Sequence, residues 1–387
     1  MRLMVIISEP ISEWIKKGEI VDRYYNPGDL FDEVHLVLCN SDSPDFQITQ
    51  RLVGRASLTI KNFDLTKRQR ITTLGLQPEL LYFWLRPLVK YAALVQPDLV
   101  RCHGATQNAL AALKIKKELG VPYTVSLHTN PDVDVRGRKG PLVHRLYNWL
   151  TIRIEKKTLR GADMVMPVYQ PIVPYLERLG VKRFKVHYNI LNAASIKSKS
   201  DYSLSSPARL ICVGRLFELK NPIKIIDAIA GSSSIELTIV GDGPLRSTLA
   251  SYVEHLGLTE RVKFRPAVSN DELCNLLFES DIFVVHSEHW EISKSVLEAL
   301  LTGLPVIINR RLGEAVPELS DGIVRLVENN AEAYASAISE LLNNPDLRKD
   351  IAEISAKRAR ELWNPEKCEK AVVATYQELM LQRASPQ

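Results

Sequence analysis

The chain of 387 residues lacks the features that mark several common protein classes. Its five cysteines are scattered and odd in number, and none has CxxC or Cys/His metal-ligand spacing. This favours a reducing compartment over a disulfide framework or a zinc site. No apolar run approaches the roughly 18 residues that a membrane-spanning helix needs, and the start, MRLMVIISEP, is too short in apolar residues for a signal peptide. The sequence predicts a cytoplasmic protein.

Two further absences argue against particular classes of function. No GxGxxG fingerprint follows any strand-like run, which lowers the case for a dinucleotide-dependent dehydrogenase. The basic part of the chain shows no recognisable nucleic-acid module and no regular interleaving of aromatic residues with cations, so we expect no nucleic-acid partner.

The composition, 45% hydrophobic and 25% charged, is that of a soluble protein, and the length predicts two domains. Residues 1–200 hold 30 Lys+Arg and 18 Asp+Glu, a balance of +12, whereas residues 201–387 hold 20 and 27, a balance of −7. The basic half indicates an anionic partner, such as a phosphorylated substrate or a membrane surface. Peripheral contact with the inner face of a membrane is therefore one expectation.

Short apolar runs alternate with helical patterns in both halves of the chain. In the first half, strand patterns lie at residues 2–8, 33–39, 97–104 and 121–129, with others near "DMVMPVY" and within "FKVHYNIL". A Ser/Lys-rich segment at 195–209 is the best linker, and the alternation restarts after it. We expect two doubly wound α/β domains, 1–200 and 201–387.

Ligands of such sheets bind at the carboxyl ends of the strands, close to helix amino termini. Arg215 follows the strand "LICVG" directly, and Lys220 precedes the Asn-Pro that opens the next helix. Two cations beside a helix amino terminus suit a diphosphate. The alternative is that both are solvated loop charges, with Glu218 pairing one of them.

Two other strand ends in the second half carry candidate residues. "IVGDGP" places Gly241 and Gly243 where a tight turn lets a ligand approach the backbone. In "SEHWEISKSVLEALLTG", residues 287–303, Ser295 and Glu298 form a capping box if the helix begins there. If it begins at Ser293 or earlier, its first amides can bind phosphate instead.

The order of these motifs from residue 209 to 326 resembles the second domain of retaining glycosyltransferases with the GT-B fold, the family four group also called glycosyl transferases group 1. A weaker likeness continues through "PDLVRCHG", "GVPYTVSLHT" and "VHYNILN". The resemblance implies two Rossmann-like domains facing a cleft, the first on the acceptor side and the second binding a nucleotide sugar. It also implies a last helix that crosses back to the first domain.

The resemblance further implies a role for individual residues. Arg215 and Lys220 fall where the family grips the donor diphosphate, and Glu298 falls where a glutamate binds the ribose. His128 falls where a histidine approaches the donor sugar. The other donor-binding positions are Gly214, Gly241, Gly243, Ser293, Lys294 and Ser295.

The chain departs from the family pattern at three places. Trp290 stands where the family has its first motif glutamate, and Glu291 one residue later takes that role only if the turn is one residue shorter. Ile190 follows Asn189 in place of glycine, and Gly18 is the only glycine in the loop after the first strand.

The family implies a metal-independent, hexosyltransferase-type reaction in which a phosphate oxygen helps to deprotonate the acceptor, with a UDP or GDP sugar as co-substrate and no other cofactor. The acceptor is a glycan, a lipid-linked molecule or a small molecule. A non-catalytic sugar-nucleotide-binding scaffold and a GT-B-fold epimerase remain as alternatives.

Asp132 and Asp134 resemble a metal-holding pair but lie in the wrong half, so we expect no metal. Segment 136–160 mixes cations with Tyr147 and Trp149, which fits either an anionic membrane surface or a core helix with a solvated basic face.

Overall fold

The protein is described by a computed structural model that covers residues 1–63, 85–132, 142–192, 195–288, 292–311, 316–320 and 322–384, with backbone alone for 142–148, 150 and 384. The chain forms two compact units. The first unit consists of Met1–Lys16, Ile20–Ile190 and Glu366–Gln387, and the second of Lys17–Glu19 and Leu191–Pro365.

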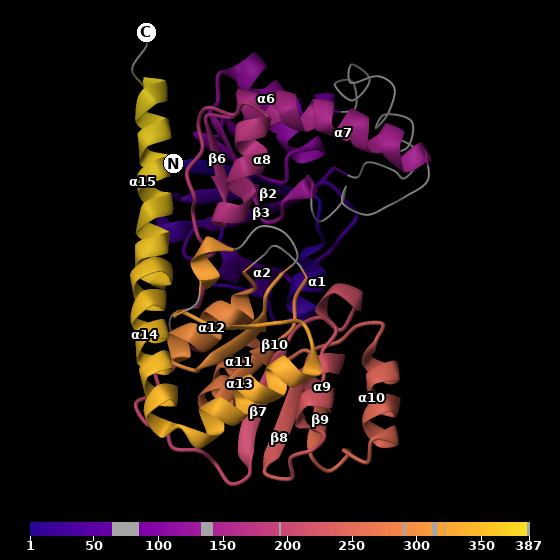
Figure 1. Ribbon diagram of the computed structural model, residues 1–387. Helices are drawn as coiled ribbons and strands as arrows, with labels where there is room; N and C mark the ends of the chain where they lie inside the picture. Colours follow the sequence, from indigo (N-terminus) through magenta and orange to yellow (C-terminus); the bar gives the residue numbers. More distant parts are fainter. Residues whose placement is uncertain are drawn as a thin grey trace. The chain divides into compact units, whose positions relative to one another are not determined.

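The first unit is built on a six-stranded sheet in the order β3-β2-β1-β4-β5-β6, in which every neighbouring pair is parallel. Figure 1 labels β2, β3 and β6 of this sheet. Its strands are β1 (Arg2–Ile7), β2 (Glu33–Leu38), β3 (Ser57–Asn62), β4 (Leu99–His103), β5 (Tyr123–Leu127) and β6 (Met164–Pro167). β1, β4 and β5 are almost entirely buried. Burial on both faces explains why these strands read as continuous apolar runs.

Helices cover both faces of this first sheet. α1 (Ile11–Lys16) and α15 (Pro365–Ala384) pack on one face, where they share a core with β1 and β2. The further α-helices in the described part of this unit are α2 (Phe46–Gln50), α5 (Arg86–Val95), α6 (Gln107–Leu119), α7 (Leu142–Gly161) and α8 (Val173–Arg178). α6 contacts β1, β4 and β5 and is flanked by α5 and α7, so these helices form the opposite layer.

The second unit repeats the architecture. Its parallel sheet has the order β12-β11-β10-β7-β8-β9. The strands are β7 (Ala208–Val213), β8 (Ile235–Val240), β9 (Val262–Arg265), β10 (Ile282–Val285), β11 (Val306–Asn309) and β12 (Arg325–Val327). Counted within each unit, both sheets have the strand order 3-2-1-4-5-6 of doubly wound folds.

Among the described residues, six α-helices lie around the second sheet. They are α9 (Ile223–Ile229), α10 (Arg246–His255), α11 (Asn270–Glu279), α12 (Lys294–Thr302), α13 (Ala331–Asn343) and α14 (Pro345–Trp363). α9, α10 and α13 share one core with β7 and β8, whereas α11 contacts β7 and α12 contacts β11 and α14. The expected two-domain α/β architecture is confirmed.

The strand order places one switch point in each sheet, where chain connections leave to opposite sides. In the second unit this point lies between β7 and β10, and in the first between β1 and β4. Crevices at the carboxyl ends of such strands are the usual ligand sites of doubly wound folds. The segments that follow β7 and β10 are therefore where a ligand of the second unit is expected.

One expected strand does not form. Residues 184–191 make a single isolated bridge, from Phe184 to Val165, and otherwise have no regular structure. The apolar residues of this segment still pack inward: Ile190 is buried in the core of the first unit. The polar His187 forms a hydrogen bond with Thr375 of α15.

Candidate functional site

The loops that follow β7 and β8 are joined by backbone hydrogen bonds. The N–H of Gly214 donates to Val240 at 3.0 Å and that of Leu216 to Asp242 at 2.9 Å, and Leu245 N–H returns to Leu216 at 3.0 Å. The backbone after β7 is therefore fixed in position by the loop after β8. Such a preformed backbone suits a binding site, because little ordering is needed when a ligand arrives.

Glycine is required at two positions in this arrangement. Gly241 has φ of 140°, and a Cβ added there would lie 2.1 Å from the carbonyl oxygen of Gly214. Gly243 has φ of 157°, and its Cβ would lie 2.2 Å from the oxygen of Leu216. Both distances are far below a van der Waals contact, so the two glycines allow the loops to touch.

Arg215 and Lys220 both lie beside the end of β7. Arg215 is exposed, and its guanidinium carbon lies 5.3 Å from the centroid of the Phe217 ring. Lys220 ends a short 3-10 turn, and its Cδ lies 3.8 Å from where a Cβ on Gly214 would be. The two cations thus flank the same short segment of backbone at the switch point.

α12 begins at Lys294, and Ser293 is its N-cap residue. Ser295 is therefore inside the first turn, and the interpretation of Ser295 and Glu298 as a capping box is wrong. The Ser293 hydroxyl makes no cap hydrogen bond to the helix and lies 3.1 Å from the Ser295 hydroxyl. The longer helix that sequence analysis allowed is the one that forms.

The start of α12 lies against the end of β7. The buried Ser295 hydroxyl donates to the carbonyl oxygen of Val213 at 3.4 Å, and the N–H of Glu288 donates to Leu219 at 2.8 Å. The helix amino terminus, with its partial positive charge, is therefore held next to the segment that carries Arg215 and Lys220. The end of β7 is thus bordered by two cationic residues and a helix amino terminus, groups of the kind that bind anions in other proteins.

Glu298 is 3% exposed and lies on the second turn of α12. Asn270, the first residue of α11, donates its side-chain N–H to Oε1 of Glu298 at 2.7 Å. Burial raises the pKa of Glu298 to about 7, although Asn270 and Lys294 act in the opposite direction. Sequence analysis missed Asn270, because nothing in the sequence relates it to a residue 28 positions away.

The end of β10 carries a second group that sequence analysis missed. His286 directly follows the strand, is buried, and has its pKa lowered to about 4 by burial and by the charge of Arg311. Its Nε2 lies 3.6 Å from Oε1 of Glu288, which also accepts a hydrogen bond from Asn329. The position of His286 directly after an apolar strand was the available signal.

In the first unit, His128 follows β5 and lies in an aromatic cluster. Its Nε2 is 3.2 Å from the Tyr24 hydroxyl, and its ring stacks on His103 with centroids 5.2 Å apart. The Tyr169 hydroxyl donates to the backbone oxygen of His128 at 3.2 Å. Contacts on the ring and on the backbone hold this histidine in one orientation.

A buried cation supports the same cluster. Arg101, in β4, donates through Nη1 to the backbone oxygen of Tyr24 at 2.8 Å. Its guanidinium carbon lies 4.9 Å from the Tyr24 ring centroid and 5.4 Å from that of Tyr25. Burial raises the pKa of Tyr24 to about 12, so its hydroxyl stays protonated across the physiological range. Arg101 thereby fixes the tyrosine that contacts His128.

Several predicted residues fall elsewhere. Glu291 and Asp134 lie outside the described residues, and Asp132 pairs with Arg178. Over the ranges that the structure covers, no three His, Cys, Asp or Glu side chains are grouped as metal ligands would be.

On α7, the Arg153 guanidinium carbon lies 4.3 Å from the centroid of the half-exposed Trp149 ring. None of the helices within the described ranges combines the length and apolar character needed to cross a bilayer.

Two family models match the chain. The model of glycosyl transferases group 1 matches residues 196–358, and that of glycosyltransferase family 4 matches residues 31–193. An uncharacterized glycosyltransferase of Methanocaldococcus jannaschii is 26% identical over 289 residues, which is 73% of this chain and 76% of the relative. The 2-deoxystreptamine glucosyltransferase of Streptomyces kanamyceticus is 26% identical over 264 residues, 62% of this chain and 66% of the relative.

Solved structures share the fold over nearly the whole chain. HepE of Anabaena, crystallised with UDP, has a TM-score of 0.76 at 15% identity and covers 98% of this chain and 100% of its own. Sucrose-phosphate synthase from Thermosynechococcus elongatus has a TM-score of 0.74 at 16% identity and covers 99% of this chain and 100% of its own. At these identities the likeness establishes the architecture of two doubly wound domains.

Proposed function

The chain belongs to the GT-B glycosyltransferases of the family 4 type, and on that basis we propose that it is a retaining hexosyltransferase that uses a nucleoside-diphosphate sugar without a metal. The observation that carries the proposal is the convergence, at the switch point of the second sheet, of Arg215, Lys220 and the amino terminus of α12. A diphosphate is the ligand whose charge and size suit that combination.

In the proposed complex the diphosphate lies between these cations and the first backbone N–H groups of α12. Negative charge grows on the diphosphate as the sugar leaves, and fixed positive groups stabilise that charge in the transition state. Arg215 offers a planar donor fork and Lys220 a point charge, so they substitute for the divalent cation that other sugar transferases use. The close contact of Gly241 and Gly243 with the β7 loop fixes the backbone that is proposed to lie beside the phosphates.

Glu298 is proposed to bind the ribose of the nucleotide. Asn270 occupies its Oε1, which leaves Oε2 to accept hydrogen bonds from ribose hydroxyls. Its burial on α12, next to the proposed phosphate site, gives the side chain a fixed direction. Ser293, Lys294 and Ser295 complete the proposed donor-binding set at the helix start.

His128 is proposed to contact the donor sugar from the first unit, and Glu291 to take the place of the displaced motif glutamate. The acceptor hydroxyl attacks the sugar carbon from the face that the diphosphate leaves, and a phosphate oxygen takes the hydroxyl proton. No covalent protein nucleophile takes part. Similar proteins include the 2-deoxystreptamine glucosyltransferase of Streptomyces kanamyceticus and an N-acetyl-alpha-D-glucosaminyl L-malate synthase of Bacillus anthracis. The proposed acceptor is a glycan, a lipid-linked molecule or a small molecule.

Nucleotide binding tests the donor site before any acceptor is known. Calorimetric titration with UDP, GDP, ADP and NAD is expected to show one nucleoside diphosphate bound, with UDP the first to try because HepE was crystallised with it. Lys220→Ala is expected to weaken that binding by about tenfold or more, equivalent to about 1.4 kcal/mol.

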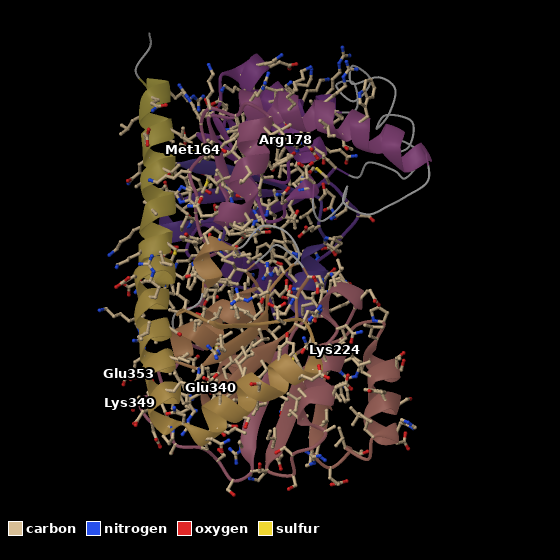
Figure 2. All side chains as sticks on the ribbon, in the orientation of Figure 1. Met164, Arg178, Lys224, Glu340, Lys349 and Glu353 are labelled. Carbon is tan, nitrogen blue, oxygen red and sulfur yellow. The ribbon has the colours of Figure 1, made fainter. Side chains whose placement is uncertain are left out.

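Lys224→Ala is the matched control. Lys224 is an exposed lysine on α9, four residues beyond Lys220 (Figure 2), so its removal changes the net charge equally, and it is not one of the proposed donor-binding residues. Equal weakening by both variants would mean a general charge effect. If none of the diphosphates binds, or if binding is indifferent to Lys220, the transferase proposal fails.

A further inference from the structure

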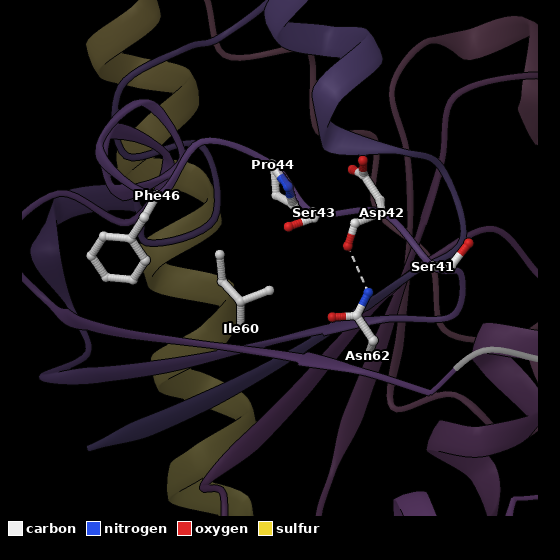
Figure 3. A pocket seen from close by; sticks show the side chains of 7 residues that line it. All are labelled: Ser41, Asp42, Ser43, Pro44, Phe46, Ile60 and Asn62. Carbon is white, nitrogen blue, oxygen red and sulfur yellow. Dashed lines mark hydrogen bonds between the residues drawn. The ribbon is translucent and has the colours of Figure 1, made fainter.

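A cavity of about 570 Å³ opens in the first unit at the carboxyl ends of β2 and β3. Its lining combines hydroxyl, amide and carboxylate groups with apolar side chains (Figure 3). The lining residues are Ser41, Asp42, Ser43, Pro44, Phe46, Ile60 and Asn62. None of the roles proposed above uses any of these residues.

The polar side of the cavity is held rigidly. Both carboxylate oxygens of Asp42 accept hydrogen bonds from Ser12 of α1, from its N–H at 3.0 Å and its hydroxyl at 2.5 Å. Asn62 donates its side-chain N–H to the backbone oxygens of Asn40 and Asp42 at 3.0 and 2.7 Å. These bonds tie the loop after β2 to both β3 and α1, so the polar groups are in place without a ligand.

The apolar side is exposed. Phe46, the first residue of α2, is 54% exposed, and Figure 3 shows its ring beside Ile60, away from Asp42 and Asn62. An aromatic ring left half in water next to a hollow is a feature of binding surfaces more than of cores. The cavity thus presents an apolar face at one end and hydrogen-bonding groups at the other.

This division matches the surface of a sugar ring. A pyranose has an apolar face of C–H groups, which packs on an aromatic ring, and a rim of hydroxyls, which bond to carboxylate, hydroxyl and amide groups. The lining contains one carboxylate, Asp42, and no cation. A phosphorylated ring would meet repulsion there, whereas a neutral or amino sugar would not.

The position of the cavity indicates which part of a substrate it holds. All strands of the first sheet are parallel, so the cavity and His128 lie on the same edge. From β2 to β5 the sheet order β2-β1-β4-β5 gives three strand steps, or about 14 Å. That distance exceeds one sugar ring, so a sugar in the cavity is not the one that reacts beside His128.

We infer that this cavity is a remote subsite for the acceptor, which takes a neutral or amino sugar of an extended glycan or glycoside. The inference rests on the proposed function, since it gives the cavity a role in sugar transfer. It also specifies the acceptor, because a molecule that reaches from the reacting sugar to the cavity contains more than one ring.

Saturation-transfer-difference NMR on the full chain tests the subsite directly. The probes are methyl α-D-glucopyranoside, methyl 2-amino-2-deoxy-α-D-glucopyranoside and glucose 6-phosphate. We expect clear transfer that depends on Phe46 to the first two, and little Phe46-dependent transfer to the phosphate. Phe46→Ala is expected to reduce the transfer about fivefold or more, and Phe46→Trp to retain it.

Trp149→Ala is the matched control, because Trp149 is an aromatic residue of the same unit that is 51% exposed. The inference is overturned if Phe46→Ala leaves transfer unchanged, if Trp149→Ala reduces it equally, or if the part of the transfer that Phe46→Ala removes is as large for glucose 6-phosphate as for the neutral glycoside. Titration of the same samples with UDP, GDP and ADP reports on the proposed donor site separately. Phe46-dependent sugar signals without binding of any of these diphosphates would therefore refute the proposed function while leaving a sugar-binding cavity.

Discussion

Asn270 donates a hydrogen bond to Glu298 across 2.7 Å and so joins the first residue of α11 to the second turn of α12. The bond satisfies one oxygen of a carboxyl group that is almost completely buried. It does not offset the cost of removing the charge from water, since the pKa of Glu298 is still raised to about 7. A buried carboxyl group with a pKa near neutrality makes the stability of the second unit depend on pH.

Glu298→Gln is expected to stabilise the protein at alkaline pH. The folded state keeps the Glu298 proton up to about pH 7, whereas the unfolded chain loses it near 4.5, so the stability of the wild type falls as pH rises between these values. A shift of that size corresponds to on the order of 3 kcal/mol. Urea unfolding should show a gain for the variant that is small at pH 4.5 and largest at pH 8.

Glu353→Gln is the control for that experiment, because Glu353 is an exposed glutamate on α14 (Figure 2) whose surface pair with Lys349 contributes little. It should change the unfolding free energy by about 0.5 kcal/mol or less at each pH. A difference between Glu298→Gln and wild type that stays constant with pH would contradict the burial argument.

Gly241→Ala is expected to destabilise the second unit by on the order of 2 kcal/mol or more, because the new Cβ would meet the Gly214 oxygen at 2.1 Å with φ at 140°. The β7 loop must then move, so we also expect weaker UDP binding. Gly231→Ala is the matched variant: its Cβ would meet nothing within 4 Å, and we expect a change within about 0.5 kcal/mol. Thermal unfolding and calorimetry measure both effects; equal behaviour of the two variants would refute the close-contact explanation.

His187→Gln is expected to make the protein more resistant to acid. Burial, with the charges of Lys185 and Arg101, lowers the pKa of His187 to about 4, while the unfolded chain takes up this proton near 6.5. Stability is therefore fully present above about pH 6.5 and falls by on the order of 3 kcal/mol as pH drops toward 4. Glutamine keeps a partner for the Thr375 hydroxyl, which lies 3.0 Å from His187 Nε2.

The measurement is the unfolding midpoint of wild type and variant between pH 4 and 7. The two curves should converge or cross as pH falls, with the variant losing less. His255→Gln, at an exposed histidine of α10, should follow the wild type throughout. A His187→Gln curve parallel to that of the wild type would show that this histidine does not cause the loss of stability at acid pH.

Tyr24→Phe tests the contact with His128. The change removes the hydroxyl that lies 3.2 Å from Nε2 and keeps the ring that Arg101 holds, so we expect slower turnover, about tenfold, with unchanged UDP affinity. Release of UDP from UDP-glucose, with water as the acceptor, measures the rate across pH. The pH profile should shift because the hydroxyl is a hydrogen-bond partner of the imidazole.

Tyr25→Phe provides the comparison, because the buried Tyr25 hydroxyl has no hydrogen-bond partner among the described residues. Removing it should leave the rate and its pH profile unchanged. If Tyr24→Phe behaves in the same way, the Tyr24 hydroxyl has no part in positioning His128.

Much of the site could be predicted because its residues belong to short contiguous patterns. The strand that precedes Arg215 is a buried apolar run, and a parallel sheet places whatever follows it at the ligand edge. The same logic predicted the position of His128 after β5. The start of α12 could not be predicted, because Ser293 and Ser295 are both suitable N-cap residues and only packing against Val213 distinguishes them.

The sequence alone determined the class of fold and the residues available at the strand ends, because strand and helix periodicity are local properties of the chain. Tertiary structure decided which of these residues meet. It brought Asn270 to Glu298, Tyr24 to His128 and Ser12 to Asp42, pairs that are 28, 104 and 30 residues apart. Contacts over such separations depend on sheet order and helix packing, and those are set by the burial of the whole core and not by any one segment.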